Sequence, residues 1–328
     1  MEKNNQKPMR WGIIGCGDVT EVKSGPPYQK TEGFELTAVM RRNKDKAQDY
    51  ARRHGVPKYY TDADALIEDP DIDAVYIATP PDSHMSYALK VAAAKKPCCV
   101  EKPMAPSYAE AKAIFEAFDK ADIPLFVAYY RRSLPRFWKI REWLEKGEIG
   151  KIRHIRWFLG KPPNDIDSSG NYNWRTDAKV APGGYFDDLA SHGLDLFAYL
   201  LGNFEKVDGI SLNQQGLYSA KDAFTASWLH SGGITGTGTW NFGCHHKEDK
   251  VEIFGSEGKI EFSIFEDLEV TLKNGSGEQN LFIAHPKHVQ EFHVESLKKH
   301  LLDNEEHPST GKTALHTSWV MDRILGAI

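Results

Sequence analysis

The sequence predicts an α/β protein with a doubly wound parallel sheet in its N-terminal part and a mostly antiparallel sheet in its C-terminal part. Over the first 130 residues, short apolar runs alternate with helical patterns, as a parallel sheet with covering helices requires. From about residue 150, apolar and polar residues alternate between Gly or Asn turns, which is typical of antiparallel strands. A length of 328 residues exceeds one ordinary small domain and agrees with more than one compact unit.

The N-terminal elements follow from the apolar runs and from the residues that stop them. The helix expected at 44–55 is polar and ends at Gly55, a good C-cap. The first helix is expected to be irregular, because Gly25, Pro26 and Pro27 interrupt it. Successive β-α-β units with right-handed crossovers give a doubly wound sheet. The expected strands are 10–15, 34–40, 57–60, 73–81, 97–102 and 124–130, and the further helical segments are 62–70, 83–96 and 107–121.

The C-terminal elements read as a meander of strands with one helix inside it. That helix is expected at 183–202 and stops at Gly202. Two more helical patterns, 286–304 and 312–328, close the chain. These patterns divide the chain into domains at 1–130, 131–285 and 286–328. The expected strands of the meander are 151–160, 207–215, 223–232, 233–243, 249–258, 259–267 and 268–275.

Composition and charge point to a small-molecule partner. A formal net charge of -5 and a pI near 6.2 give no electrostatic reason to bind nucleic acid or an anionic membrane. The first residues are too polar for a signal peptide, and no run reaches the roughly 20 apolar residues that span a bilayer. The sparse cysteines form no CxxC pair, which favours reduced thiols in a cytoplasmic protein. They are Cys16, Cys98, Cys99 and Cys244.

A glycine turn after the first strand predicts a dinucleotide site. Gly15 and Gly17 stand where a tight turn and a close approach to a pyrophosphate need them, with Asp18 and Val19 in the same turn. The third position of this fingerprint is Thr20 rather than Gly. The pattern alone is weak in a chain with 27 glycines, and its place at the end of the first strand strengthens it.

The end of the second strand favours NADP over NAD as the cofactor. An NAD site usually has an acidic residue there for the ribose hydroxyls, whereas this chain has Arg41 followed by Arg42. A guanidinium can bind a 2'-phosphate bidentately. The alternative is that both arginines are solvated at a helix start, and NAD stays open as the cofactor.

Three strand ends place polar residues at one edge of the parallel sheet. Ligands of such sheets bind in the crevice outside the carboxyl ends of the strands. Thr79, Pro80 and His84 follow the apolar run 74–78 of the fourth strand, and Glu101 and Lys102 end the strand at 97–102. We therefore expect these residues beside the cofactor, with Lys102 at the innermost place. The alternative is that polar residues and a proline simply end the strand.

The C-terminal helix carries a second group of reactive side chains. Asp188 and His192 are four residues apart, so on an α-helix they share one face with Cβ atoms about 6 Å apart. A carboxylate one turn from an imidazole can orient it and tune its pKa. A structural His with a surface Asp would give the same pattern. The spacing also suits metal ligands, but no third ligand is near, so no metal site is predicted.

Taken together, these residues resemble the Gfo/Idh/MocA family, which is named for glucose-fructose oxidoreductase and inositol 2-dehydrogenase. The resemblance covers nearly the whole chain and rests on ordered motifs: GIIGCG, DAVYIATPPDSH, VEKP, VAYYRR, NWRTD and GGYFDDLASHGLD. It implies an N-terminal Rossmann domain and an open-faced sheet domain for substrate binding and oligomerisation, as a homodimer or homotetramer. It also implies that the C-terminal helices pack back on the Rossmann domain.

The resemblance assigns roles to residues at matching positions. Lys102, Asp188 and His192 match the catalytic set, which also binds the substrate. Glu101 matches a residue that contacts the nicotinamide ribose. The other matches are Trp174 and Arg175 near the nicotinamide, Arg132 after the sixth strand, and Tyr130 where members vary with substrate.

The resemblance implies an oxidoreductase that transfers a hydride between a nicotinamide and a secondary hydroxyl or carbonyl of a sugar, polyol or keto-sugar. Lys102 would polarise the substrate oxygen, His192 would relay the proton, and Asp188 would orient the histidine. Two alternatives remain: redox-neutral glycoside cleavage with tightly bound NAD, and a non-catalytic dinucleotide sensor on the same scaffold.

Overall fold

The computed structural model describes residues 7–328, which divide into two compact units. The first unit comprises residues up to 105 together with 109–130 and 286–314. The second comprises 106–108, 131–285 and 315–328. Both units are therefore built from chain segments that are distant in the sequence.

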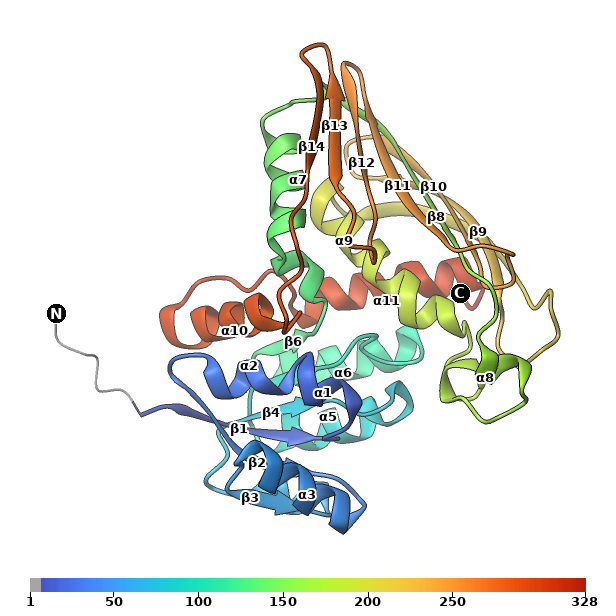
Figure 1. Cartoon of the computed structure of the whole chain (residues 1–328). Helices are drawn as coiled ribbons and strands as arrows, with labels where there is room; N and C mark the ends of the chain where they lie inside the picture. The colour runs from blue at the N-terminus through green and yellow to red at the C-terminus, as the bar shows by residue number, and fades with distance from the viewer. Residues whose placement is uncertain (1–6) are drawn as a thin grey trace, which may run out of the picture. The chain divides into compact units, whose positions relative to one another are not determined.

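The first unit contains a six-stranded parallel sheet in the order β3-β2-β1-β4-β5-β6 (Figure 1). The strand order reverses direction between β1 and β4, and such a switch point is where doubly wound sheets bind ligands. The predicted parallel sheet is confirmed. Its strands are β1 (Met9–Ile14), β2 (Phe34–Met40), β3 (Lys58–Tyr60), β4 (Ala74–Ile77), β5 (Cys98–Val100) and β6 (Leu125–Val127).

The helices of the first unit begin and end where local signals predict. In α3 (Lys44–His54), the Asn43 side chain accepts a hydrogen bond from the Lys46 N–H, and Gly55 ends the helix with a φ of 65°. The first helix is split, as expected, into α1 (Asp18–Val22) and α2 (Gly25–Lys30). The others are α4 (Ala63–Glu68), α5 (His84–Ala93), α6 (Tyr108–Ala121) and α10 (Glu291–Asp303).

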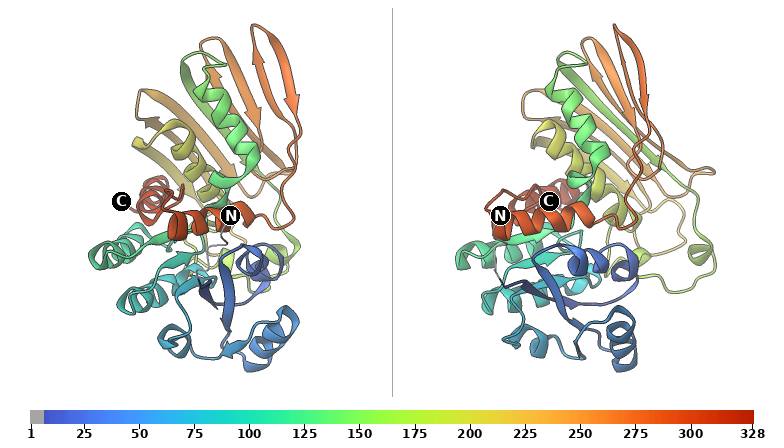
Figure 2. Two further views of the ribbon diagram at one scale, coloured as in Figure 1. Left: turned by 90° about the vertical axis from the view of Figure 1, so that its left-hand side faces the viewer. Right: turned by 60° about the vertical axis from the view of Figure 1, so that its left-hand side comes forward.

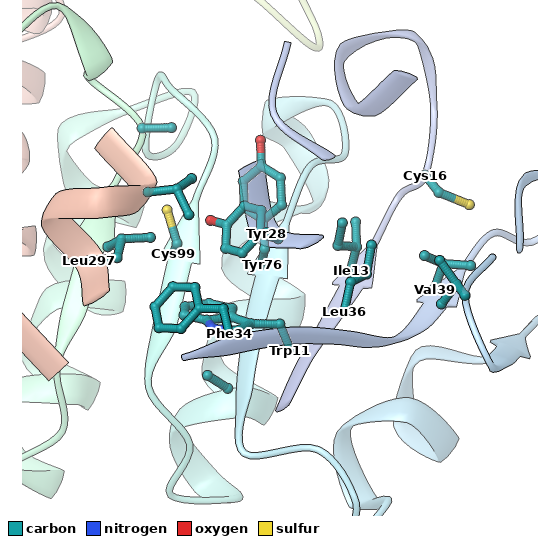
Figure 3. Packing of buried hydrophobic residues seen from close by; sticks show 14 of the residues in the cluster. Trp11, Ile13, Cys16, Tyr28, Phe34, Leu36, Val39, Tyr76, Cys99 and Leu297 are labelled. Carbon is teal, nitrogen blue, oxygen red and sulfur yellow. The ribbon is translucent and has the colours of Figure 1, made fainter. Parts of the chain in front are cut away.

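Aromatic rings fill the core of the first unit. Trp11 lies between Tyr28 and Phe34, with ring centroids 4.8 and 5.3 Å away. The rings of Tyr28 and Tyr76 stack at 5.0 Å, and Leu297 of α10 belongs to the same cluster (Figure 3). Helix α10 also contacts α2, as both views of Figure 2 show. A segment near the C-terminus thus completes the core that the N-terminal strands begin.

The second unit contains an eight-stranded sheet in the order β14-β13-β12-β11-β7-β10-β9-β8. All neighbouring strands are antiparallel except β7 and β10, which agrees with the predicted, mostly antiparallel sheet. The strands are β7 (Ile152–Gly160), β8 (Phe204–Leu212), β9 (Ala223–His230), β10 (Ile234–Asn241), β11 (Glu248–Gly255), β12 (Gly258–Phe262), β13 (Val270–Asn274) and β14 (Gly277–Leu281).

Only one face of this sheet is deeply buried. Trp157 and Trp240 are almost fully buried, and the Trp157 ring packs edge-on against Phe197 of α9 (Ser191–Leu201). The alternate residues Thr235, Thr237 and Thr239 of β10 are exposed. The period of two seen in the sequence therefore separates a helix-covered face from an open one.

Several elements differ from the expectation. Helix α7 (Pro135–Glu145) was not predicted, although Pro135 at its first position favours a helix start, and neither α8 (Asp165–Ser168) nor β14 was predicted. The strand expected at 124–130 ends at Val127, and Tyr130 begins a 3₁₀ turn, Tyr130–Ser133. Helix α11 (Gly311–Leu325) closes the chain where a helical pattern was expected.

The cysteines and histidines outside the candidate site have ordinary environments. All four cysteines are free thiols, as predicted, and Cys98 and Cys99 are fully buried. His245 and His246 are exposed. Among residues 7–328, no three His, Cys, Asp or Glu side chains are grouped so that they could hold a metal ion. Within the same residues, no helix has the length and apolar character needed to cross a membrane.

His230 predicts a pH-dependent stability of the second unit. Its Nδ1 donates to the Gly202 carbonyl at 2.7 Å, while its Nε2 accepts from the Trp228 indole N–H at 3.0 Å, so the ring must be neutral. Burial lowers its pKa from 6.5 to about 4. Because the unfolded chain gains a proton first as pH falls, His230 should lose roughly 3 kcal/mol of its stabilisation between about pH 6.5 and pH 4.

Urea unfolding of the wild type and of His230→Gln at pH 7, 6 and 5 tests this prediction. The stability advantage of the wild type should shrink steadily as the pH falls. A difference between the two proteins that does not change with pH would contradict the assigned protonation state.

Candidate active site

The turn after β1 requires glycine at position 15. Gly15 has a φ of 95°, and its N–H and that of Cys16 both donate to the Met40 carbonyl, at 2.9 and 3.2 Å. A Cβ on Gly15 would lie 2.6 Å from the Thr79 side chain and 2.9 Å from the Ala78 carbonyl carbon. Only glycine therefore lets β1 turn directly against the end of β4, which leaves the backbone accessible to a ligand at this edge.

Thr20 takes the third fingerprint position without disturbing the turn. It is fully buried, and its hydroxyl donates to the Gly17 carbonyl at 2.7 Å. The Tyr50 hydroxyl donates to the Thr20 carbonyl at 2.8 Å, and a Cβ on Gly25 would lie only 2.2 Å from that same oxygen. The break in the first helix thus allows Thr20, Tyr50 and Gly25 to pack together.

Arg41 lies beside the glycine turn, as predicted. Its Nη1 donates to the Cys16 carbonyl at 3.0 Å, which holds the guanidinium at the end of β2 next to the turn. Arg42 is exposed, and the Asn43 side chain caps α3. No acidic residue occurs between 40 and 44, so the position that suits a ribose diol in an NAD site is basic here.

His84 connects two strand ends by its ring nitrogens. Its Nε2 lies 2.8 Å from the Thr79 carbonyl oxygen, and its Nδ1 lies 3.1 and 3.3 Å from the carbonyl oxygens of Pro103 and Met104. The ring is fully buried, and burial lowers its pKa below 6.5. These contacts fix the ring between two strand ends, and the predicted contact of His84 with the cofactor stays a prediction.

The carboxylate of Glu101 is buried at the end of β5 and accepts three hydrogen bonds. The Tyr76 hydroxyl and the Gln290 amide donate to Oε1, at 2.5 and 2.6 Å, and the Lys102 N–H donates to Oε2 at 3.1 Å. Sequence reasoning missed Tyr76 and Gln290, since the first reads as a core residue and the second is distant in the chain. The predicted contact of Glu101 with a ribose stays a prediction.

Lys102 directly follows this anchored carboxylate. It is half-buried, and its peptide bond to Pro103 is cis. Pro103 and Met104 are buried. The neighbours of Lys102 on both sides are therefore fixed within the first unit, by the Glu101 network and by His84.

In the second unit, Asp188 is paired with Arg175. The Arg175 Nε donates to Asp188 Oδ2 at 2.9 Å, and its guanidinium lies over the Trp174 ring, 4.3 Å from the centroid. The Asn173 side chain accepts from the Arg175 N–H at 3.2 Å and so caps this short turn, Trp174–Thr176. Trp174 and Arg175, which were predicted as site residues, thus form one cluster with the acid.

The helix predicted at 183–202 is not a regular α-helix at Asp188. Residues Phe186–Ala190 form a π-helical turn, and the α-helix α9 begins only at Ser191. A π turn bonds i to i+5 rather than i+4, and the pairing of Asp188 with His192 stays a prediction. His192 is buried, and its ring contacts Phe265 edge-on at 5.9 Å. Such turns are frequent at functional sites.

Asp187, next to Asp188, is a functional candidate that sequence reasoning missed. It is buried and accepts a hydrogen bond from the Gly183 N–H at 2.8 Å. Burial, with smaller contributions from Asp322 and Asp188, raises its pKa to about 7. The doubled acid in the sequence was the available signal, but it could not show which carboxyl is buried.

Arg132 binds within the second unit. Its Nε and Nη2 donate to the Asp195 carboxylate at 2.6 and 2.7 Å, and Thr317 donates to the same carboxylate at 3.0 Å. Both members of this ion pair are buried. This bidentate pair gives the guanidinium a structural role, and the predicted contact of Arg132 with the cofactor stays a prediction.

The remaining predicted residues have simpler positions. Asp18 is exposed and Val19 half-buried at the start of α1, Pro80 is exposed, and Tyr130 is half-buried at the start of the 3₁₀ turn. The structure thus brings together the residues at the edge of the parallel sheet in the first unit. It brings together Trp174, Arg175 and Asp188 in the second unit. Lys102 belongs to the first unit, and Asp188 and His192 belong to the second.

Two family models match the chain. Residues 9–129 match the model described as an oxidoreductase family with an NAD-binding Rossmann fold, and residues 137–261 match the GFO/IDH/MocA C-terminal domain. The protein belongs to the Gfo/Idh/MocA family. A member of this family is a hydride-transferring oxidoreductase, which accords with the glycine turn of the first unit.

Relatives and solved structures of the Gfo/Idh/MocA family cover nearly the whole chain. Oxidoreductase P35 of Formosa agariphila is 38% identical over 97% of this chain and 98% of its own. Myo-inositol 2-dehydrogenase of Thermotoga maritima is 29% identical over 83% of this chain and 80% of its own. A levoglucosan dehydrogenase in complex with NADH and L-sorbose matches with a TM-score of 0.86 at 22% identity, over 97% of this chain and 96% of that one. This last agreement shows the shared fold.

His84→Ala should destabilise the first unit by roughly 2–4 kcal/mol. The substitution removes the ring N–H, so that a buried carbonyl oxygen loses its donor, and it opens a void at the end of β4. Chemical denaturation measures the loss, and His245→Ala, which removes an exposed ring, should change the free energy of unfolding by less than about 0.5 kcal/mol. Equal stability of the two variants would contradict the structural role that we assign to the His84 ring between the two strand ends.

Proposed function

We propose that the protein is an NADP-dependent dehydrogenase or reductase that acts on a secondary hydroxyl or carbonyl group of a sugar, polyol or keto-sugar. The observation that carries the proposal is Lys102, which follows the buried Glu101 carboxylate at the ligand-binding edge of a dinucleotide-binding sheet. The names of the relatives, which include inositol and levoglucosan dehydrogenases, support a sugar or polyol as the substrate class.

The residues present at the sheet edge fit a dinucleotide. Glycine at position 15 lets the turn pack closely against Ala78 and Thr79, and Gly17 leaves open space beside the next turn, where a pyrophosphate can approach the backbone. We assign Gly15, Gly17, Asp18, Val19, Thr79 and Pro80 to this cofactor site, as the sequence predicts. The nicotinamide, when bound, accepts or donates the hydride.

The side chains of the protein provide the proton chemistry. We propose that the ammonium of Lys102 donates a hydrogen bond to the reacting oxygen of the substrate and so stabilises the alkoxide character that develops there. His192 accepts the hydroxyl proton during oxidation and returns it during reduction. Asp188 orients the reacting groups, and its pairing with Arg175 fixes the carboxylate in the second unit.

Arg41 supports NADP in preference to NAD. Its guanidinium is tied to the Cys16 carbonyl beside the glycine turn, and no carboxylate follows β2 to bind a ribose diol. A phosphate in that position would gain a charge-assisted hydrogen bond. Arg42 is exposed next to it and can add a second charge.

We further propose a cytoplasmic homodimer or homotetramer that associates through the open face of the second unit's sheet. The exposed threonines of β10 and the exposed Ile210 and Leu212 of β8 lie on this sheet. We also propose that residues 1–130 bind the dinucleotide, that 131–285 bind the substrate and mediate association, and that 286–328 form the C-terminal helices that pack on the first of these domains.

Lys102→Met should lower kcat by about 10³-fold or more on any sugar that the wild type converts, because the substituted side chain keeps its length and loses its charge. Cofactor affinity, measured by quenching of tryptophan fluorescence, should change by less than about threefold. The assay follows nicotinamide absorbance with a panel of sugars and polyols that includes myo-inositol and levoglucosan. Full turnover by this variant would end the assignment of Lys102.

Arg41→Ala should weaken NADPH binding by roughly 10- to 100-fold and leave NADH binding within about threefold, since the phosphate contact is made by NADPH alone while the hydrogen bond to Cys16 is lost with either cofactor. The matched control is Arg52→Ala, because the Arg52 side chain is 76% exposed on α3 and forms an ion pair with Asp49. Fluorescence titrations with both cofactors measure the ratio of the two dissociation constants. If the wild type bound NADH as tightly as NADPH, the preference for NADP would be wrong.

A further inference from the structure

A pocket lies in the second unit, next to the segment that carries Arg175. It has a volume of about 340 Å³ and is formed by two stretches of chain, residues 167–177 and 217–219. Its walls include Asp167, Tyr172, Asn173, Thr176, Leu217 and Tyr218. None of these six was predicted as a site residue.

The rim of this pocket presents apolar surface to solvent. Tyr172 is 74% exposed and Leu217 is 45% exposed. A large exposed aromatic ring beside a polar pocket can stack on the C–H face of a sugar, because one side of the ring is open to solvent. The polar residues Asn171 and Asp177 also line the pocket and can hydrogen-bond sugar hydroxyls.

The inner part of the pocket is polar and held in place. The Tyr185 hydroxyl donates to the buried Asp167 carboxylate at 2.8 Å, and the Asn173 amide donates to the same carboxylate at 3.2 Å. The Tyr218 hydroxyl is buried, and within residues 7–328 it has no hydrogen-bond partner. A buried hydroxyl without a partner costs free energy, and a ligand hydroxyl would satisfy it.

The short turn that carries Arg175 also contributes residues to the pocket. Asn173 and Thr176 line the pocket, while Arg175, between them in the chain, reaches Asp188 at 2.9 Å. The Asn173 side chain also caps the turn that carries Arg175. One short turn thus takes part both in the pocket and in the ion pair of Asp188.

We propose that this pocket binds a second sugar ring, so that the substrate is a glycoside or disaccharide rather than a free monosaccharide. The inference rests on the proposed function, because it takes Asp188 to mark the reacting ring. Tyr172 stacks on the second ring, and Tyr218 and Asn173 hydrogen-bond its hydroxyls.

The test compares kcat/KM for matched substrates: glucose with cellobiose and maltose, galactose with lactose, and xylose with xylobiose. For at least one pair, the wild type should favour the disaccharide by about tenfold or more. Tyr172→Ala should remove about tenfold of that preference through KM and leave the monosaccharide unchanged. Tyr218→Phe, which keeps the ring, should raise KM for the disaccharide by a smaller factor. Phe282→Ala, which removes a ring of 61% exposure, is the control and should change neither value.

A binding measurement separates failure of this inference from failure of the proposed function. Saturation-transfer NMR with the same four disaccharides on the full-length protein needs no turnover. Binding that Tyr172→Ala abolishes and Phe282→Ala preserves supports the pocket even if no sugar is oxidised. Absence of binding by all four disaccharides, or an equal loss of activity on both members of each pair in Tyr172→Ala, overturns the inference.

Discussion

The end of β5 depends on a single buried carboxylate. The Tyr76 hydroxyl, the Gln290 amide and the Lys102 N–H donate hydrogen bonds to Glu101 in place of water. Without those donors, a buried carboxylate charge would cost several kcal/mol of stability. Its partners come from β4 and from the segment before α10, so one side chain joins three parts of the first unit. The constraint explains why an acid and a base follow an apolar strand: the acid is anchored, and the base after it is held in place.

This anchoring explains why the first unit needs a segment from near the C-terminus. Gln290 reaches Glu101, while Leu297 of α10 enters the aromatic core of Trp11, Tyr28 and Tyr76. Folding of the N-terminal strands alone would leave the carboxylate short of a donor. The second unit also buries a carboxylate, that of Asp195, but there the partner is a charged side chain, because Arg132 donates two hydrogen bonds to it.

The sequence was sufficient wherever a local signal decides the structure. Period and capping residues predicted α3, the split first helix and the parallel strands, and strand-end position predicted Arg41 beside the glycine turn. It was insufficient where distant residues decide. The donors to Glu101, the ring contacts of His84 and the π-helical turn around Asp188 all depend on tertiary packing, which no spacing reveals. The roles of Lys102, Asp188 and His192 in catalysis stay predictions.

The most direct test follows deuterium from the substrate to the cofactor, and it asks whether the protein transfers a hydride from a sugar to an exchangeable nicotinamide cofactor at the site of Lys102. A sugar or polyol of the panel, labelled with deuterium on its ring carbons, is incubated with NADP⁺ and the protein, and the reduced cofactor is examined by proton NMR. We predict deuterium at C4 of the nicotinamide, and its absence with Lys102→Met. Conversion of the sugar with no deuterium in the recovered cofactor would contradict the account and indicate redox-neutral chemistry.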